Sequence, residues 1–335
     1  MGRWVLIAAL GLSGCGLVGY DLSALSSSDS GPVDGDGSPI DVDGSTATVP
    51  TGECFGAVTG TYVGNGEPER EIGLEFQPVL VIVHSAAGRA PMLRMVTMPP
   101  NQSKQAIGGS PLETNVLSEA VDGFLVGADV RVNNSGETYF WVAFPAAGTA
   151  TGQYGGNGAS QSISGLEMTP EWILIADEGD GVVVTRFDNA LDRTYRLEGL
   201  DGVTGGVTSL DSDGFSLAGR PYSNADGRTF HYVAWRSEVG RILASGYTGD
   251  GTVSRLIEPG FRPDYLMIRN QSQERAFHRF APQLGDVSLP FDSGVPIIDA
   301  IESLEDSGFQ IGPDPAVNES GTEVSYLSFA SCAGG

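Results

Sequence analysis

Basic side chains are scarce in this sequence of 335 residues. It has 18 lysine and arginine residues against 42 aspartate and glutamate residues, and its formal net charge at pH 7 is −24. Lys104 is the only lysine. Proteins that bind nucleic acids or anionic lipid surfaces do so with clustered positive charge. The composition therefore argues against a nucleic acid partner and against a peripheral grip on an anionic membrane.

Histidines and catalytic motifs are scarce as well. Each of the three histidines occupies a different position of the internal repeat described below: His84, His231 and His278. Metal binding and general-base catalysis need side chains that converge on one point. The sequence also lacks the His-Glu-x-x-His and Gly-x-Ser-x-Gly motifs and any phosphate-binding glycine loop with its lysine. We therefore predict that the protein is not an enzyme and uses no metal and no cofactor.

The apolar run at the N-terminus is short. It extends from Val5 to Leu12, whereas a membrane-spanning helix needs roughly 20 apolar residues. Arg3 precedes the run and Leu12-Ser13-Gly14-Cys15 follows it. This arrangement resembles the signal sequence of bacterial lipoproteins.

The resemblance implies a lipid anchor. Residues 1–14 would be the signal peptide, and Cys15 would be lipidated and provide the only contact with the membrane. Because Gly16 rather than aspartate follows Cys15, the resemblance also implies the outer membrane or cell surface. An ordinary secretory signal at a chance apolar N-terminus is the alternative.

The segment after the anchor is acidic and poor in large apolar side chains. Between Ser23 and Gly52 it consists mainly of Ser, Asp, Gly, Pro and Thr, so it cannot bury enough surface to offset its ordering entropy. We predict a disordered linker over residues 15–53. The phrases around Asp34 and Asp41 resemble calcium loops, but the twelve-position pattern that ends in glutamate is missing, which favours a solvated linker.

A threefold internal repeat fills the rest of the chain. Tyr62, Tyr154 and Tyr247 each begin a Tyr-x-Gly-Asn-Gly or Tyr-x-Gly-Asp-Gly phrase, at intervals of 92 and 93 residues. Sixteen residues later each copy has a proline and then a hydrophobic run. The second half of each copy has a Gly-Phe pair, an asparagine nine residues after the phenylalanine, a glycine and an aromatic segment. The predicted repeats occupy residues 54–148, 149–240 and 241–335.

The repeats predict an all-β fold. Their segments are short, rich in Val, Ile, Tyr, Phe and Trp, and separated by turn residues, which is typical of β-sandwiches. We therefore expect three tandem antiparallel β-sandwich repeats. Residues Ile297 to Leu304 are the best candidate for a short helix, although the other copies do not support it. The turns that begin at Asn133, Asn224 and Asn318 are expected to form hairpins, each with the asparagine capping its own backbone.

The last segment of each repeat is expected to be a central strand. Strand alternation places Trp141, Tyr232 and Tyr326 on one face and Phe144, Trp235 and Phe329 on the other. Because both faces are apolar, both must be covered.

The cysteines predict that the repeats close on themselves. If Cys15 carries lipid, Cys54 and Cys332 remain, one just before the first repeat and the other just after the last strand. In an exported protein such a pair is most simply a disulfide. Its Cα atoms must lie within about 7 Å, so the first repeat would begin beside the end of the third.

The repeat pattern resembles two known families. The resemblance rests on Phe76-Gln77-Pro78, Phe261-Arg262-Pro263, Gly214-Phe215 and Tyr232-Val233-Ala234-Trp235. The repeat is similar to the H-type lectins, which are six-stranded sandwiches that assemble as trimers and bind sugars. It is also similar to an uncharacterised repeat domain of phage-tail and bacterial surface proteins. The lectin resemblance implies that three repeats in one chain correspond to a lectin trimer.

Some polar residues recur in all three copies and are candidate ligand contacts. The arginines either contact a ligand or pair with a nearby acidic residue, and the second interpretation is favoured. For the asparagines a turn-capping role is favoured over sugar contact. A histidine at position 231 replaces Phe140 and Ser325, which indicates a position that tolerates polarity and reaches solvent. The candidates are Arg94, Arg186, Arg279, Asn133, Asn224, Asn318 and His231.

Two functional hypotheses follow. The first is a surface lipoprotein, anchored to the membrane, that binds a glycan or another cell-surface ligand through its repeats, with the gain in avidity that repeated sites provide. The second is a structural protein of the cell envelope or of a phage-tail-like particle that contacts protein partners.

Overall fold

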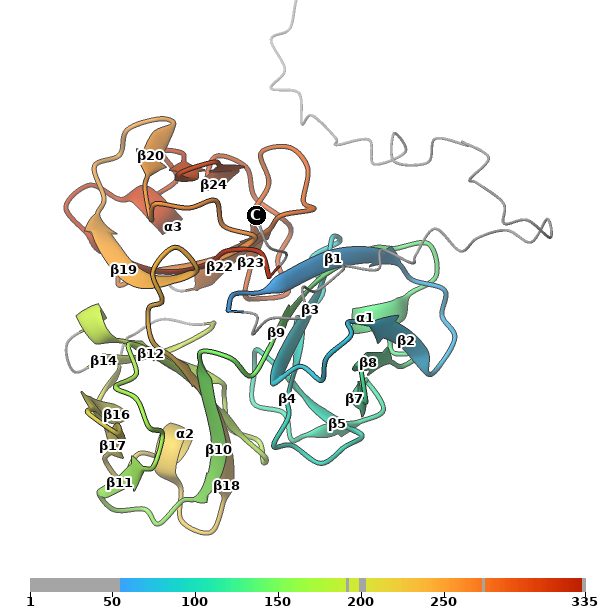
Figure 1. Cartoon of the computed structure of the whole chain (residues 1–335), viewed down its shortest axis with the longest axis vertical. Coiled ribbons are helices and arrows are strands. Elements are labelled where there is room, and N and C mark those ends of the chain that lie inside the picture. The colour runs from blue at the N-terminus through green and yellow to red at the C-terminus, as the bar shows by residue number, and fades with distance from the viewer. Residues whose placement is uncertain (1–54, 191–192, 199–202, 273–274, 333–335) are drawn as a thin grey trace, which may run out of the picture. The chain divides into compact units, whose positions relative to one another are not determined.

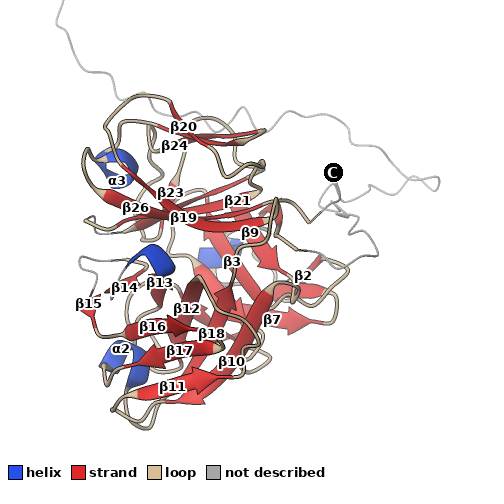
Figure 2. Cartoon of the chain, turned by 60° about the vertical axis from the view of Figure 1, so that its left-hand side comes forward, coloured by secondary structure: helices blue, strands red, loops and turns tan. Residues whose placement is uncertain are grey.

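The computed structural model describes residues 55–190, 193–198, 203–272 and 275–332. The predicted signal peptide, the lipidation site Cys15, the linker and Cys54 lie outside the described residues. The described residues form three modules, each with one large and one small antiparallel sheet (Figures 1 and 2). The predicted all-β fold of three sandwich-like repeats is therefore confirmed. None of the described helices combines the length and apolar character needed to span a membrane.

Module 1 is coloured blue to green in Figure 1. Its large sheet has the strand order β1-β9-β3-β4-β5-β6, and its small sheet has the order β2-β8-β7. The elements are β1 (Val58–Val63), β2 (Arg70–Gly73), β3 (Leu80–Ser85), β4 (Met92–Met95), β5 (Gln102–Gln105), β6 (Glu113–Thr114), β7 (Leu117–Ala120), β8 (Gly123–Val126), α1 (Val130–Asn133) and β9 (Thr138–Phe144).

Module 2 repeats this topology. Its sheets have the orders β10-β18-β12-β13-β14-β15 and β11-β17-β16. The elements are β10 (Thr149–Gly155), β11 (Gln161–Ser164), β12 (Trp172–Asp177), β13 (Val184–Phe187), η2 (Asp188–Ala190), β14 (Arg193–Arg196), β15 (Val203–Thr204), β16 (Val207–Asp211), β17 (Gly214–Leu217), α2 (Pro221–Asn224) and β18 (Thr229–Trp235).

Module 3 repeats it again with a large sheet of five strands. Its sheets have the orders β19-β26-β21-β22-β23 and β20-β25-β24. The elements are β19 (Ile242–Thr248), β20 (Arg255–Ile257), β21 (Tyr265–Asn270), β22 (Ala276–Phe280), β23 (Leu289–Pro290), β24 (Ile301–Glu305), β25 (Gly308–Ile311), α3 (Pro315–Asn318) and β26 (Glu323–Phe329).

The last strand of each module lies between two neighbours and is buried on both faces. In module 1, Trp141 on β9 is paired with Gly60 on β1 and with Val83 on β3. Trp141 belongs to the core between the two sheets of its own module. Its indole occupies the space beside Gly60, where any Cβ would collide with the ring. The predicted two-faced burial of this strand is confirmed.

The opposite face of the same strands is covered by the other modules. The rings of Phe144, Trp235 and Phe329, one from each module, have centroids 4.7 to 5.7 Å apart. All three belong to one apolar cluster, the shared core, which draws residues from all three modules. The three counterpart side chains therefore meet at one point, and each module contacts the other two.

The start of module 1 lies beside the end of module 3. The backbone N–H of Ala57 donates to the carbonyl of Ala330 at 3.0 Å, and the N–H of Cys332 donates to the carbonyl of Ala57 at 3.0 Å. Cys332 is buried in the core of module 1. The neighbourhood that a Cys54–Cys332 bond requires is thus present, and the disulfide itself stays a prediction because Cys54 lies outside the described residues.

The repeated tyrosine phrase ties the first strand of each module to its short helix. The hydroxyls of Tyr62, Tyr154 and Tyr247 donate to helix carbonyls at 2.6 to 2.7 Å. The first glycine of the phrase, Gly64 in module 1, lies so close to the carbonyl of Asn134 that no Cβ fits there. The phrase is therefore a packing motif.

The predicted helix at Ile297 to Leu304 is wrong. Ile297 exchanges two backbone hydrogen bonds with Ser288, and β24 begins at Ile301. Short helices form instead just before the last strands, where the sequence predicts hairpin turns. In α1 and α3 the side chains of Asp129 and Asp314 accept hydrogen bonds from the first turn, which stabilises these one-turn helices.

Candidate functional site

The three recurring arginines are buried within their modules. Arg94, Arg186 and Arg279 are each at most 5% exposed. Arg94 pairs with Glu119 at 3.1 Å, as the favoured interpretation expects. Arg186 donates to the carbonyl of Val207 at 3.2 Å. Burial lowers the pKa of Arg94 and Arg279. These guanidinium groups satisfy backbone carbonyls between the two sheets and are not placed to meet a ligand from solvent.

Replacing Arg279 with alanine is expected to destabilise the protein. Its guanidinium donates to the carbonyls of Ile301 at 3.0 Å and Gln283 at 3.4 Å, and also to those of Val287 and Gly285. Each buried acceptor that loses its donor costs about 1–3 kcal/mol. We expect urea unfolding to show a loss of at least about 2 kcal/mol. Replacement of the exposed Arg236 by alanine is the control and should leave the stability unchanged. A normal stability of the Arg279 variant would contradict this role.

The recurring asparagines are also internal. Asn133, Asn224 and Asn318 are 0% exposed, and each ends its one-turn helix. The Asn133 side chain accepts from the N–H of Asn65 at 2.8 Å and donates to the carbonyl of Glu67 at 2.7 Å. The other two copies make the same pair of bonds. The asparagines thus cap the glycine-rich loop after the first strand, rather than their own turn.

The expectation that His231 reaches solvent is wrong. Its side chain is 0% exposed and lies at the interface of modules 1 and 2. Nδ1 lies 2.9 Å from the Thr97 hydroxyl, and Nε2 lies 3.0 Å from the Glu178 carboxylate. Burial lowers the pKa of His231, and Glu178 partly offsets this. Polarity is tolerated at this position because Thr97 of module 1 and Glu178 of module 2 supply one partner each.

The position of His231 in the repeat contacts a neighbouring module in every copy. In module 1 it is Phe140, which stacks on Phe280 of module 3 with ring centroids 5.9 Å apart. In module 3 it is Ser325, whose hydroxyl donates to the side chain of Asn189 in module 2 at 2.9 Å. The three interfaces therefore use one repeat position with three different chemistries.

A hollow lies at the interface of modules 2 and 3, beside Asn189, the residue that Ser325 contacts. We call it the 2–3 hollow, and its volume is about 170 Å³. At the other two interfaces the corresponding position holds an imidazole or a phenyl ring. The 2–3 hollow is lined by Glu171, Phe187, Asp188 and Asn189 of module 2 and by Ala244, Ser245 and Gly246 of module 3.

The 2–3 hollow combines polar side chains with an aromatic one. Glu171 and Asp188 contribute carboxylates, and Asn189 contributes an amide whose oxygen is held by Ser325. The Glu171 carboxylate accepts from the Ser237 hydroxyl, which in turn accepts from the N–H of Ala244 at 3.1 Å. These bonds join the two modules and hold the acceptors in place. Carboxylate, amide and hydroxyl groups that surround one space suit a polyhydroxylated ligand.

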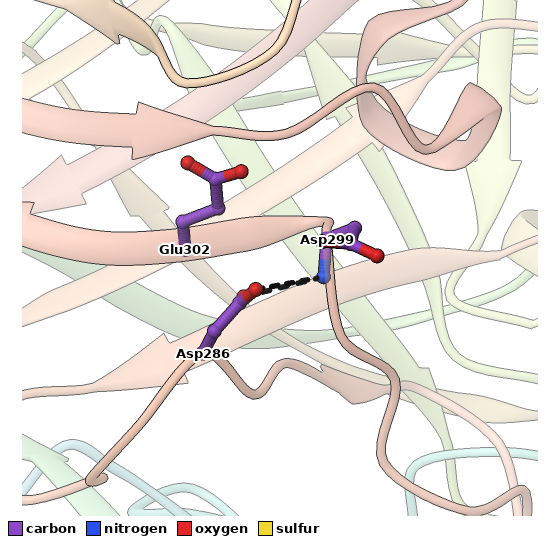
Figure 3. A group of neighbouring side chains, drawn as sticks. All are labelled: Asp286, Asp299 and Glu302. Carbon is purple, nitrogen blue, oxygen red and sulfur yellow. Dashed lines mark hydrogen bonds between the residues drawn. The ribbon is translucent and has the colours of Figure 1, made fainter. Parts of the chain in front are cut away.

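Three carboxylates of module 3 lie close together at its surface (Figure 3). One oxygen each of Asp286, Asp299 and Glu302 lie within 4.8 Å of one another. Both oxygens of Asp286 lie 3.2 Å from the N–H of Asp299, so a backbone donor already compensates part of this charge. Oxygen ligands of this kind suit a hard cation such as calcium. The sequence did not single out this group, because its members follow no calcium-loop spacing.

The residues that line the 2–3 hollow are not shared by the three copies, so recurrence in the sequence did not point to them. Asn189 corresponds to Thr97 in module 1, and Ser245 corresponds to Gly152 in module 2, so the residues that line the hollow differ between copies. The indication in the sequence was Ser325, a small residue at a repeat position that holds phenylalanine in module 1 and histidine in module 2. Comparison of the chain with protein-family models finds no match, and comparison with curated proteins finds none either.

Proposed function

We propose that this chain is a lipid-anchored protein of the bacterial outer membrane or cell surface that binds a glycan and catalyses no reaction. The lipoprotein-like signal and the acidic linker support the anchoring. The observation that carries glycan binding is the 2–3 hollow, whose carboxylates, amide and hydroxyl surround a space beside Phe187. Pockets for drug-sized ligands measure roughly 300–1,000 Å³, so a hollow of about 170 Å³ suits a single sugar ring.

A glycan array tests this proposal. The full lipidated chain in detergent should bind a subset of the array, and Asp188→Ala should weaken that binding at least about tenfold, the effect of losing one charge-assisted hydrogen bond. Asp188 is exposed, and no described residue donates a side-chain hydrogen bond to it, so the variant should fold normally. Asp226→Ala, at an exposed site near Gly158 of module 2, is the control with the same charge change. If both variants bound glycans equally well, the 2–3 hollow would not be the glycan site.

Contact with a protein partner is the second candidate. Among the exposed large apolar side chains of module 3, three lie between residues 284 and 298: Leu284 is exposed by 69%, Val295 by 74% and Ile298 by 58%. The bond between Asp286 and Asp299 brings the segments of Leu284 and Ile298 together. Exposed apolar groups that cluster favour protein contact. A folded chain that binds nothing on the array would favour this candidate, and Leu284→Ser should then weaken the protein contact.

A further inference from the structure

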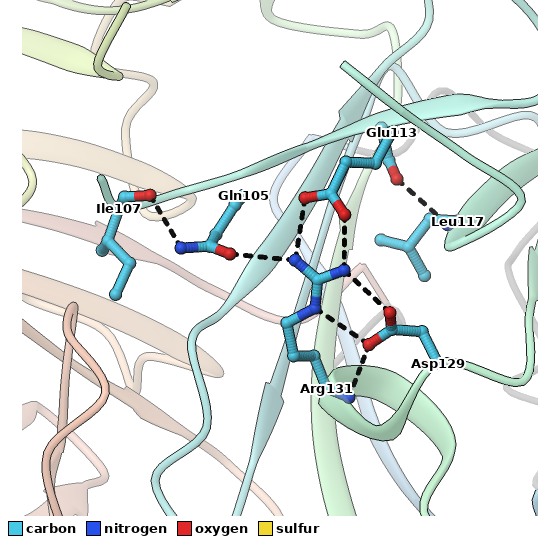
Figure 4. Close-up of polar contacts among 7 residues, drawn as sticks. Gln105, Ile107, Glu113, Leu117, Asp129 and Arg131 are labelled. Atoms are coloured by element: carbon cyan, nitrogen blue, oxygen red, sulfur yellow. Dashed lines mark hydrogen bonds and ion pairs between the residues drawn. The ribbon is translucent and has the colours of Figure 1, made fainter. Parts of the chain in front are cut away.

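In module 1 one arginine is neutralised by two carboxylates. The Arg131 guanidinium contacts Asp129 at 2.8 Å and Glu113 at 2.6 Å, and it donates to the amide oxygen of Gln105 at 2.9 Å (Figure 4). Both carboxylates stabilise the charge and raise the pKa of Arg131. The network joins β5, β6 and the start of α1, and its polar groups partner one another.

The same positions in module 2 carry different charges. Met92 pairs with Gln105 across β4 and β5, and the corresponding pair in module 2 is Val184 with Arg196. Asp129 is the N-cap of α1, and Arg220 is the N-cap of α2. Tyr222, the second residue of α2, corresponds to Arg131. Module 2 therefore replaces an amide and a carboxylate with two guanidinium groups.

The corresponding positions of module 3 contain no cation. Phe277 pairs with Pro290, which corresponds to Arg196, and Asp314 is the N-cap of α3. Ala316 corresponds to Tyr222. The pair of arginines is thus a property of module 2 alone and does not follow from the requirements of the fold.

The charges of Arg196 and Arg220 both influence the pKa of the Tyr222 hydroxyl. Burial raises the pKa of Tyr222, and the two guanidinium groups lower it. No hydrogen-bond partner for this buried hydroxyl exists among the described residues. Arg220 lies over Gly205, where a Cβ would be 3.3 Å from Nε. Both guanidinium groups therefore lie near one buried hydroxyl, beside strand β14 of the large sheet.

No carboxylate of the described residues pairs with either arginine. Six other arginines form ion pairs with aspartate or glutamate: Arg89, Arg94, Arg131, Arg228, Arg255 and Arg275. Glu198 is two residues from Arg196, but it accepts instead from the N–H of Gly108 in module 1 at 2.5 Å. In a chain with 42 acidic residues, two exposed arginines that pair with no acidic side chain of the described residues provide guanidinium groups that an external anion can contact.

We infer that Arg196 and Arg220 form an anion site of module 2 that binds a carboxylate or sulfate group of an acidic saccharide. Two guanidinium groups provide parallel N–H donors that match the oxygens of either group. The saccharide part rests on the proposed function, whereas the anion site stands on the arginines alone. The site is separate from the 2–3 hollow, whose carboxylates disfavour an anion.

The test uses the full lipidated chain in detergent with three probes: inorganic sulfate, a linear trisaccharide of three uronates, and a neutral trisaccharide. Calorimetry should show that sulfate and the uronate bind, that salt weakens both, and that the neutral trisaccharide is not bound at this site. The variant R196Q/R220Q should lose at least about tenfold in affinity for both anions. The variant R236Q/R262Q changes two other exposed arginines by the same charge and should bind like the original chain.

The outcomes separate the two proposals. Binding of sulfate and not of the uronate, lost in R196Q/R220Q, would keep the anion site and overturn the acidic saccharide as its ligand. Anion binding that is equal in both variants would overturn the site, as would no binding of either anion. A glycan array that stays silent while sulfate binds would overturn glycan binding and leave the anion site in place.

Discussion

Replacing Phe144 with alanine is expected to destabilise all three modules at once. The side chain is 1% exposed and lies within 6 Å, ring centroid to centroid, of Trp235, Tyr265 and Phe329. Removing a buried phenyl ring costs about 3–5 kcal/mol, because the apolar contacts are lost and a cavity remains. Since the ring touches modules 2 and 3, we expect hydrogen exchange to accelerate in the large sheets of all three modules.

Phe124→Ala is the matched control. Phe124 is also 1% exposed and also belongs to module 1, but it packs within the core of that module against Trp141. The two variants should lose similar stability in denaturant titrations, because both remove one buried phenyl ring. Exchange in the Phe124 variant should accelerate mainly in module 1. If the Phe144 variant also affects only module 1, the shared core does not couple the modules.

The repeat made the fold predictable from the sequence. The last strands align without gaps in three copies, and residues at intervals of two fall on the faces that the structure gives them. The positions of Trp141 and Phe144 therefore predicted two buried faces. What covers the second face could not be read from the alternation, because a strand pattern does not distinguish a sheet of the same module from a sheet of another. The positions of Cys54 and Cys332 supplied the expectation of closure.

Recurrence was a weaker guide to the candidate site. Arg94 and its counterparts recur because in each copy the buried guanidinium donates to backbone carbonyls inside the module. Asn133 recurs because each copy has the same glycine-rich loop to cap. Both requirements come from the fold, and a search for residues shared by all copies selects such requirements. The 2–3 hollow and the Arg196–Arg220 pair are instead places where one copy departs from the others. Both proposed sites therefore rest on differences between the copies and not on the residues that the copies share.

Acid is expected to destabilise the interface of modules 1 and 3 strongly. His84 Nδ1 lies 2.7 Å from His278 Nε2, and both side chains are 0% exposed. Burial lowers the pKa of His84 to about 3, although Asp292 partly offsets this, and burial together with the neighbouring His84 lowers the pKa of His278. At neutral pH both rings are thus uncharged in the folded protein. The Tyr265 hydroxyl lies 3.0 Å from His278 Nδ1, so the tyrosine and the two histidines form one series of polar contacts.

The sign of the pH dependence follows from proton uptake on unfolding. An unfolded histidine has a pKa of about 6.5, so between this value and the lower folded pKa the unfolded chain binds more protons. The stability from the neutral pair is present above pH 6.5 and is lost as the pH falls below it. Each histidine contributes a slope of up to about 1.4 kcal/mol per pH unit, so the pair contributes up to about 2.7 kcal/mol per pH unit.

The repeat itself provides the variant that isolates this effect. Ala176 and Thr185 occupy the positions of His84 and His278 in module 2, so H84A/H278T introduces residues that the fold already accepts there. Denaturant unfolding between pH 6.5 and 5 avoids most carboxylate titration, which lies lower. Over this window the original chain should lose stability much more steeply than the variant. His231 remains in both proteins, so any slope that it contributes cancels in the comparison. Equal slopes would mean that the pair does not stay neutral in the folded protein, because only a difference in proton binding between the folded and unfolded states makes stability depend on pH.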